Sequence, residues 1–175
     1  AQLAAKSAPD GYTQMMGTIA HSVSMTLYEK PGYDLVRDFA PVTMLAIGSF
    51  LLAVHPSVPA RSVKQLVALA KARPGQINVG VSGAGIMMTS GLFQSMTGIK
   101  MAPVTYRSTP QTVIALLSGE VSVGFPSTSA AMAHVRSAKL RGLGVTTPRR
   151  SSMAPEIPTI AEAGVPGYEA SSWYG

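Results

Sequence analysis

The chain has 175 residues, enough for one complete hydrophobic core or for one domain with part of a second. Its composition, 46% hydrophobic and only 13% charged, is globular and excludes a disordered chain. The net charge of +6 favours anionic partners, but the basic residues are scattered and the 6% aromatic content argues against nucleic acid. The absence of cysteine excludes disulfides, zinc–thiolate sites and cysteine nucleophiles. No apolar run reaches the roughly 18 residues of a membrane-spanning helix.

The first third of the chain carries weak signals of regular structure. A turn at residues 9–11 precedes a predicted strand at 12–16, and residues 19–40 are expected to be irregular. A short apolar run predicts a strand at 50–54. Ser62 then caps a helix whose apolar residues recur at i, i+3, i+4 and i+7, and the segment Arg73-Pro74-Gly75 ends this helix.

Strands and helices alternate regularly over the middle of the chain. Further strands are predicted at 77–81, 101–106, 121–125 and 140–145, and helices at 86–96 and 129–138. Between them, Thr109 and Pro110 read as the N-cap and first residue of a helix that ends at Gly119. Its expected inner residues are Val113, Ile114, Leu116 and Leu117. Five strands alternating with helices predict βαβ units and a parallel sheet.

The last segment departs from this alternation. Residues 148–158 read as a loop. Thr159 and Glu162 have the spacing of a capping box and predict one short helix, which Gly164 and Pro166 then break. Residues 168–174 are expected to be extended.

A glycine-rich segment, Gly80-Val81-Ser82-Gly83-Ala84-Gly85, joins a predicted strand to a predicted helix. Glycines allow the backbone to approach a ligand closely, and the first turn of a helix leaves unpaired N–H groups at its positive end. Such a place binds phosphate, sulfate or carboxylate without a charged side chain. The segment therefore predicts an anion site.

In an open parallel sheet, ligands lie beyond the carboxyl ends of the strands. The residues predicted at this edge are His55, residues 82–85, Arg107-Ser108-Thr109, Pro126-Ser127-Thr128 and Thr146-Thr147. The edge is rich in hydroxyls and backbone amides, with one arginine and no acid, which suits a small polar anion. Hydroxyl groups in these positions are also ordinary helix caps, so this reading stays open beside the functional one.

Other chemistries fit the sequence less well. Ser82 lies in a near match to the nucleophile elbow of serine hydrolases, with Glu120 and His134 as acid and base candidates. Glu120, however, precedes a predicted strand and should face away from Ser82. The dinucleotide and P-loop fingerprints are incomplete. The histidines are far apart in sequence and have no acidic partners at ligand spacing, which argues against a metal site.

Several segments occur in the order found in one known family: Pro9-Asp10-Gly11-Tyr12-Thr13, Asp38-Phe39-Ala40-Pro41-Val42, Ile77-Asn78-Val79-Gly80, Pro155-Glu156-Ile157-Pro158-Thr159, Glu162-Ala163-Gly164 and Ser171-Ser172-Trp173-Tyr174-Gly175. On these segments the chain resembles the extracytoplasmic solute receptors of tripartite tricarboxylate transporters, the Bug (TctC-like) family. The resemblance covers almost the whole chain.

The resemblance implies an α/β fold of the periplasmic-binding-protein type, a type II Venus flytrap. It implies one complete parallel-sheet α/β lobe at residues 45–150, a partial first lobe at 1–44 and a return segment at 151–175. We expect the chain to lack family segments at both ends, and no signal peptide is visible in it. An exposed first-lobe remnant is free to pair with another chain, so self-association is an open alternative.

The resemblance further implies a periplasmic receptor that binds a small carboxylate-bearing solute and delivers it to a membrane permease. No catalysis, cofactor or metal is expected. An enzyme that uses Ser82 and an interaction or sensor lobe remain alternatives. Taken with the predicted sheet edge, the resemblance gives these expected ligand-binding residues: Thr18, Ile19, Ala20, His21, Ser82, Gly83, Ala84, Gly85, Ile86, Arg107, Ser127 and Thr128.

The sequence departs from the family pattern beside the glycine-rich segment. Relatives usually place Ser or Thr and a His there, whereas this chain has Ile86-Met87-Met88. Pro126 stands where relatives usually have an acid, and Arg107-Ser108 where they usually have Lys-Gly. These differences predict a more apolar and less acidic pocket.

Overall fold

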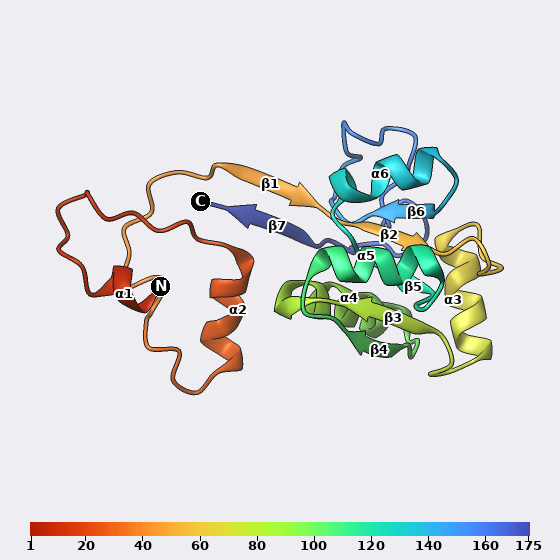
Figure 1. Ribbon diagram of the computed structural model, residues 1–175, viewed down its shortest axis with the longest axis horizontal. Helices are drawn as coiled ribbons and strands as arrows, with labels where there is room; N and C mark the ends of the chain where they lie inside the picture. Colours follow the sequence, from red (N-terminus) through yellow and green to blue (C-terminus); the bar gives the residue numbers. More distant parts are fainter. The chain divides into compact units, whose positions relative to one another are not determined.

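The computed structural model of the protein describes residues 1–175 and divides the chain into two compact units (Figure 1). One unit comprises residues 1–47 and 172–175, and the other comprises residues 48–171. Both divisions fall inside strands, β1 (Ala46–Ser49) and β7 (Ser171–Tyr174), which pair as a two-stranded sheet. The borders expected from sequence lie at 44 and 150, whereas these divisions lie at 47 and 171, so that residues 151–171 group with the larger unit. None of the helices combines the length and apolar character needed to cross a bilayer.

The smaller unit contains two helices, α1 (Gln2–Ala5) and α2 (Ile19–Leu27). The strand predicted at 12–16 is wrong, because this mostly exposed segment has no strand partner and an unpaired extended segment is not stable by itself. The prediction of irregular structure for 19–40 is wrong where α2 forms. Thr18 has the extended backbone of an N-cap, and Ile19 and Val23 lie one turn apart, with Val23 buried.

The larger unit is built on a five-stranded sheet. Its strands are β2 (Leu51–Val54), β3 (Asn78–Val81), β4 (Ala102–Thr105), β5 (Val123–Gly124) and β6 (Arg141–Val145). All five were predicted, each with slightly wider bounds. Their order across the sheet is β4-β3-β5-β2-β6.

The sheet is mixed, so the prediction of an all-parallel sheet is wrong in one strand. β3 is parallel to both β4 and β5, whereas β2 is antiparallel to both β5 and β6. β2 is buried along its whole length, so its residues carry no alternation that could have indicated its direction. The carboxyl end of β2 consequently lies at the sheet edge where the other four strands begin.

Four helices flank this sheet: α3 (Val63–Ala72), α4 (Gly83–Thr97), α5 (Thr109–Ser118) and α6 (Thr128–Arg136). The Ser62 cap of α3 is confirmed, because the Ser62 hydroxyl accepts a hydrogen bond from the Gln65 N–H at 3.2 Å. The predicted Thr109 cap of α5 is wrong by one residue, since Ser108 has the extended backbone of the N-cap. The expected inner position of Ile114 is also wrong, because its side chain is 65% exposed.

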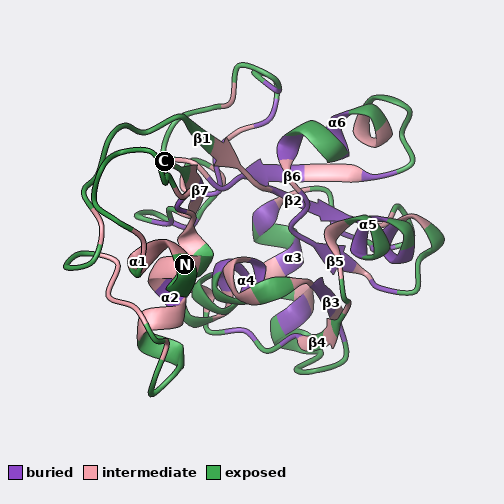
Figure 2. Ribbon diagram, turned by 60° about the vertical axis from the view of Figure 1, so that its left-hand side comes forward, coloured by how far each residue is buried: buried purple, intermediate pink, exposed green.

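The core lies on both faces of the sheet, and Figure 2 shows β2, β3 and β5 coloured mostly as buried. The side chains of β2 alternate between the faces: Leu52 and Val54 pack with residues of α3 and α4, and Leu51 and Ala53 with residues of α5 and α6. On the first face, the rings of Phe93, Phe125 and Tyr168 meet edge to face, with centroids 5.9–6.0 Å apart. Tyr168 thereby packs the return segment against the core.

The return segment forms the capping-box hydrogen bonds but no helix. The Thr159 N–H donates to the Glu162 carboxylate and the Glu162 N–H donates to the Thr159 hydroxyl, both at 3.0 Å. Residues 160–164 nevertheless form only turns, so the short helix predicted there is wrong. Gly164, at φ 122°, and the following proline stop the chain before a second turn can add hydrogen bonds.

Candidate functional site

The first turn of α4 is the central part of the candidate site. Ser82 alone separates β3 from α4 and is the N-cap, so Gly83, Ala84 and Gly85 already belong to the helix. The helix therefore begins three residues before the predicted start at 86. The backbone N–H groups of this turn have no partners within the helix and stand at its positive end.

The glycines of this segment have different roles. Gly83 has φ +72°, a conformation that other residues rarely adopt, and a Cβ there would meet no atom within 4 Å. Gly80 lies inside β3, and a Cβ there would come within 2.7 Å of Thr112 Cγ2 and 3.1 Å of Val121 Cγ2. Gly80 is thus required by packing beneath α5, and only the residues from Ser82 onward can serve a ligand.

The first turns of α4, α5 and α6 follow the carboxyl ends of β3, β4 and β5, with Ser82, Ser108 and Ser127 as the N-caps. The Ser82 hydroxyl lies 3.3 Å from the Thr109 hydroxyl, which joins the starts of α4 and α5. The side chains of Ser82 and Ser108 form no capping hydrogen bond. They differ in this from Ser127, whose Oγ accepts the Ala130 N–H at 3.4 Å. Thr109 was absent from the expected ligand-binding residues.

Arg107 lies directly before the α5 N-cap and is exposed. Its backbone N–H donates to Gln111 Oε1 at 3.2 Å, which fixes the main chain. Its guanidinium forms neither a hydrogen bond nor an ion pair; the ion pairs of the chain are Arg37–Asp34 and Arg150–Glu162. All five guanidinium N–H groups are therefore available to an anion.

Thr128 is held by the structure rather than presented to a ligand. Its side chain is only 1% exposed, its Oγ1 donates to the Ser49 carbonyl at 3.1 Å, and the two side-chain hydroxyls are 2.7 Å apart. Buried Thr146 acts similarly, because its Oγ1 accepts the Phe50 N–H at 3.0 Å. Ser49 and Phe50 reach this edge because β2 starts there, so they could not be found while β2 was taken as parallel.

Ile86 and His55 differ from expectation. The Ile86 side chain is buried in the core, so it is not presented at the surface of the first turn of α4. His55 was expected at the same edge as Ser82, which is wrong because β2 runs the other way. The His55 N–H donates to the Ser122 carbonyl at 3.0 Å, and its Nδ1 is 2.7 Å from the Ser57 hydroxyl.

In the smaller unit, the expected ligand residues Thr18, Ile19, Ala20 and His21 form the start of α2. The Thr18 N–H donates to His21 Nδ1 at 3.1 Å, so Nδ1 is an acceptor and the proton of the neutral ring is on Nε2. The His21 carbonyl accepts the Tyr33 hydroxyl at 3.1 Å. The His21 side chain therefore caps the first turn of α2. The Ala20 side chain is exposed, and those of the other three are half-buried.

The residues considered for hydrolysis do not assemble around Ser82. Glu120 lies just before β5, at the edge opposite Ser82, as expected from the sequence; its Oε1 accepts the Tyr106 hydroxyl at 2.8 Å. Burial together with this bond raises the pKa of the Tyr106 hydroxyl. His134 lies in the last turn of α6, while Thr109 supplies the side-chain contact of Ser82.

Comparisons with known proteins agree on one family. The family model described as "Tripartite tricarboxylate transporter family receptor" matches residues 1–175. The protein BugT of Bordetella pertussis (strain Tohama I) is 32% identical over 97% of this chain and 53% of its own length. The chain spans about half the length of the curated relatives it matches.

Solved structures give the same picture. The structure of R. palustris Rpa4515 with adipate is 36% identical, with a TM-score of 0.86 over 99% of this chain and 59% of that one. MatC (Rpa3494) from Rhodopseudomonas palustris with bound malate has a TM-score of 0.84 over 99% of this chain and 60% of that one. At 24% identity, the MatC structure is informative about the fold alone.

Proposed function

Because this chain belongs to the tripartite tricarboxylate transporter receptor family, we propose that it is part of an extracytoplasmic receptor for a small carboxylate-bearing solute. In this proposal the receptor acts in the periplasm and delivers the solute to a membrane permease of the tripartite tricarboxylate type. The reading of the fold as a periplasmic binding protein agrees with the solved relatives.

One observation of this chain carries the proposal: the helix starts at Ser82 and Ser108 meet beside an arginine without an acidic partner. Two helix starts supply backbone N–H groups and positive dipole ends, and the hydroxyls of Ser82 and Thr109 lie 3.3 Å apart there. Arg107 adds a planar cation that matches the two oxygens of a carboxylate. The named residues include no carboxylate that would compete with a bound anion.

The structure of a relative that is 36% identical to this chain was solved with adipate, and this supports a dicarboxylate as the solute. We propose that one carboxylate of such a solute accepts hydrogen bonds from the N–H groups of residues 83–85 and from the Ser82 hydroxyl. The Arg107 guanidinium donates hydrogen bonds to the two oxygens of the other carboxylate. Ser127 lies next to this site, whereas Thr128 supports it through the hydrogen bond that its hydroxyl donates to the Ser49 carbonyl.

The start of α2 is a separate proposal within the smaller unit. The Thr18 N–H is already used by His21 Nδ1, so the backbone N–H groups of Ile19 and Ala20 are the free donors there. We propose these N–H groups, rather than the His21 ring, as the anion-binding groups of that segment.

A non-enzymatic role is part of the proposal. The acid expected for a hydrolase lies at the opposite sheet edge, and the Ser82 hydroxyl faces Thr109 rather than a histidine. A fluorophosphonate probe tests this point directly. We expect no labelling, and labelling that Ser82→Ala abolishes would restore the hydrolase reading.

The proposal is tested by thermal unfolding with adipate, shorter dicarboxylates and neutral 1,6-hexanediol at constant ionic strength. A ligand that binds the folded state raises its melting temperature by mass action, so at least one dicarboxylate should raise it and the diol should not. Arg107→Gln should weaken the binding of the dicarboxylate that raises the melting temperature by about tenfold, the usual cost of losing a charge-assisted hydrogen bond. The matched control is Arg73→Gln, at the exposed C-cap of α3. Equal shifts with diol and dicarboxylate would contradict the proposal.

A further inference from the structure

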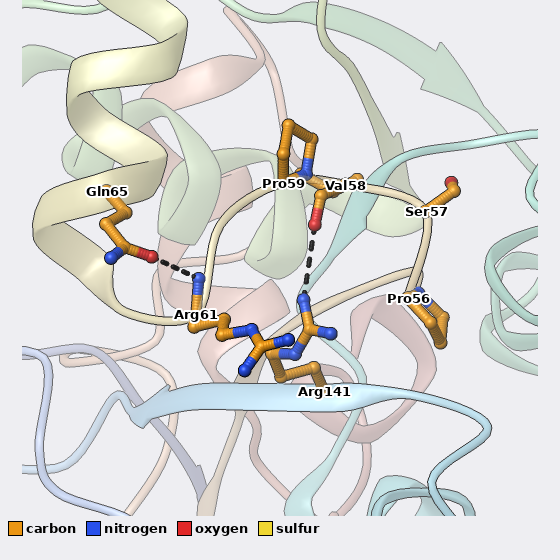
Figure 3. Close-up of a pocket in the computed structure, with 7 residues that line it drawn as sticks. All are labelled: Pro56, Ser57, Val58, Pro59, Arg61, Gln65 and Arg141. Atoms are coloured by element: carbon orange, nitrogen blue, oxygen red, sulfur yellow. Dashed lines mark hydrogen bonds between the residues drawn. The ribbon is translucent and has the colours of Figure 1, made fainter.

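A hollow of about 490 Å³ lies at the sheet edge opposite the site described above (Figure 3). Val54, the last residue of β2, pairs with Arg141, the first residue of β6, and this pair marks the edge. The loop after β2, the first turn of α3 and the start of β6 line the hollow. Two of its lining residues are arginines, Arg61 and Arg141, and none is an acid.

Arg141 is positioned by the backbone of the loop. Its Nη1 donates to the carbonyls of Val58 at 3.2 Å and Ala60 at 2.9 Å, and Figure 3 shows the side chain reaching from β6 toward the loop. The other guanidinium nitrogens bond to no protein atom, and no buried side-chain nitrogen of the chain is unsatisfied. These nitrogens are therefore not fully buried, and Arg141 is one of the residues that line the hollow.

Arg61 supplies a second guanidinium. Its backbone N–H donates to Gln65 Oε1 at 2.7 Å, which fixes the residue just before α3, and the residue is exposed. In Figure 3 its side chain extends in the direction of Arg141. Neither arginine takes part in an ion pair, because both ion pairs of the chain lie elsewhere.

We propose that this hollow binds a small oxyanion with at least two charged oxygens, of the phosphate or dicarboxylate type. Two guanidinium groups that line one hollow repel each other, and an oxyanion between them replaces this repulsion by paired charge-assisted hydrogen bonds. The positive end of α3, which starts at the capping residue Ser62, adds a field of the same sign. None of these residues belongs to the site at Ser82 and Arg107, so this proposal stands independently of the proposed function.

The test is a titration of the 15N-labelled chain followed by amide NMR shifts, with inorganic phosphate in one arm and adipate in the other. Sodium chloride holds the ionic strength constant. We expect saturable shifts at the amides of residues 57, 58, 60–65 and 141 in at least one arm. A response to phosphate alone identifies a phosphate-type ligand, and a response to adipate alone identifies a carboxylate-type ligand.

Arg61→Gln should weaken binding in the responding arm by about tenfold or more, since it removes charge-assisted hydrogen bonds from an exposed residue. Arg73→Gln and Arg107→Gln should leave it unchanged. Three results would overturn the proposal: no saturable shifts at these amides in either arm, equal affinity in Arg61→Gln, or equal loss in Arg73→Gln. The amide spectrum of each variant also shows whether it is folded.

Discussion

At the scale of single residues, the glycine-rich segment divides into a packing part and a ligand part. Gly80 is confined by Thr112 and Val121, whereas Gly83 faces open space in a left-handed backbone conformation. The sequence predicted the segment as a whole because glycine clusters are visible in it. It could not separate the two roles, because they depend on which side chains of α5 and of the segment before β5 lie against β3.

Gly80→Ala should destabilise the protein by about 1–3 kcal/mol, because its new methyl group would overlap Thr112 Cγ2 in a packed core. Gly91→Ala is the matched control: Gly91 lies inside α4 with no atom within 4 Å of the new Cβ. This control should stabilise the protein slightly, because alanine favours helix. Urea unfolding of both variants measures the effect, and equal stability of the two would show that Gly80 is not required by packing.

Glu162 makes a pH-dependent contribution to stability. The Thr159 N–H, and then the Arg150 guanidinium, lower the pKa of its carboxyl below the ordinary value of 4.5. A carboxyl whose pKa is lowered by folding stabilises the folded state above its unfolded pKa, and this stabilisation is lost as the pH falls through the folded value.

Glu162→Gln should therefore lower the melting temperature at pH 7, and its difference from the wild type should disappear as the pH falls below the ordinary value of 4.5. Thermal unfolding of the variant and of the wild type across the acid range measures this difference. A difference that persists at the lowest pH would mean that Glu162 acts through packing rather than charge.

At the scale of elements, the sequence predicted most of the larger unit. The strands and helices from residue 50 to residue 145 are confirmed because apolar periodicity, the Ser62 cap and the Gly119 stop are local signals. The direction of β2 is set by its neighbours in the sheet. Because β2 is antiparallel to its neighbours, His55 lies at the sheet edge opposite the candidate site and Ser49 lies at the edge of the site.

Elements near the ends of the chain were predicted less well. The capping-box hydrogen bonds of Thr159 and Glu162 form as expected, but a box supplies only a helix start and Gly164 follows too soon. In contrast, α2 forms where no helix was expected, and His21 serves there as the acceptor for the Thr18 N–H. Histidine in this position is an unusual partner, and sequence rules for caps do not look for it.

At the scale of the whole molecule, the two units differ in how much apolar surface they bury. Both core clusters lie within residues 51–168, whereas Val23 is the one buried large apolar residue of the smaller unit. Several large apolar side chains of residues 1–47 are exposed, among them Tyr12, Val36 and Val42. Self-association through them remains a prediction that light scattering can test.

This difference predicts a difference in local stability. Amide hydrogen exchange should show slow exchange for β2, β3 and β6 and fast exchange for α1 and α2, because opening free energy follows buried apolar contact. A chain restricted to residues 48–171 should keep the slow pattern of the sheet. Loss of that pattern in the shorter chain would mean that the larger unit depends on residues outside it.

The central claim is that a carboxylate binds at the start of α4. Amide NMR shifts on addition of adipate, in the wild type and in Arg107→Gln, test it most directly. The account predicts saturable shifts at Gly83, Ala84 and Gly85 that need about tenfold more adipate in the variant. Saturation that leaves these three amides unmoved, or moves them equally in both proteins, would contradict it.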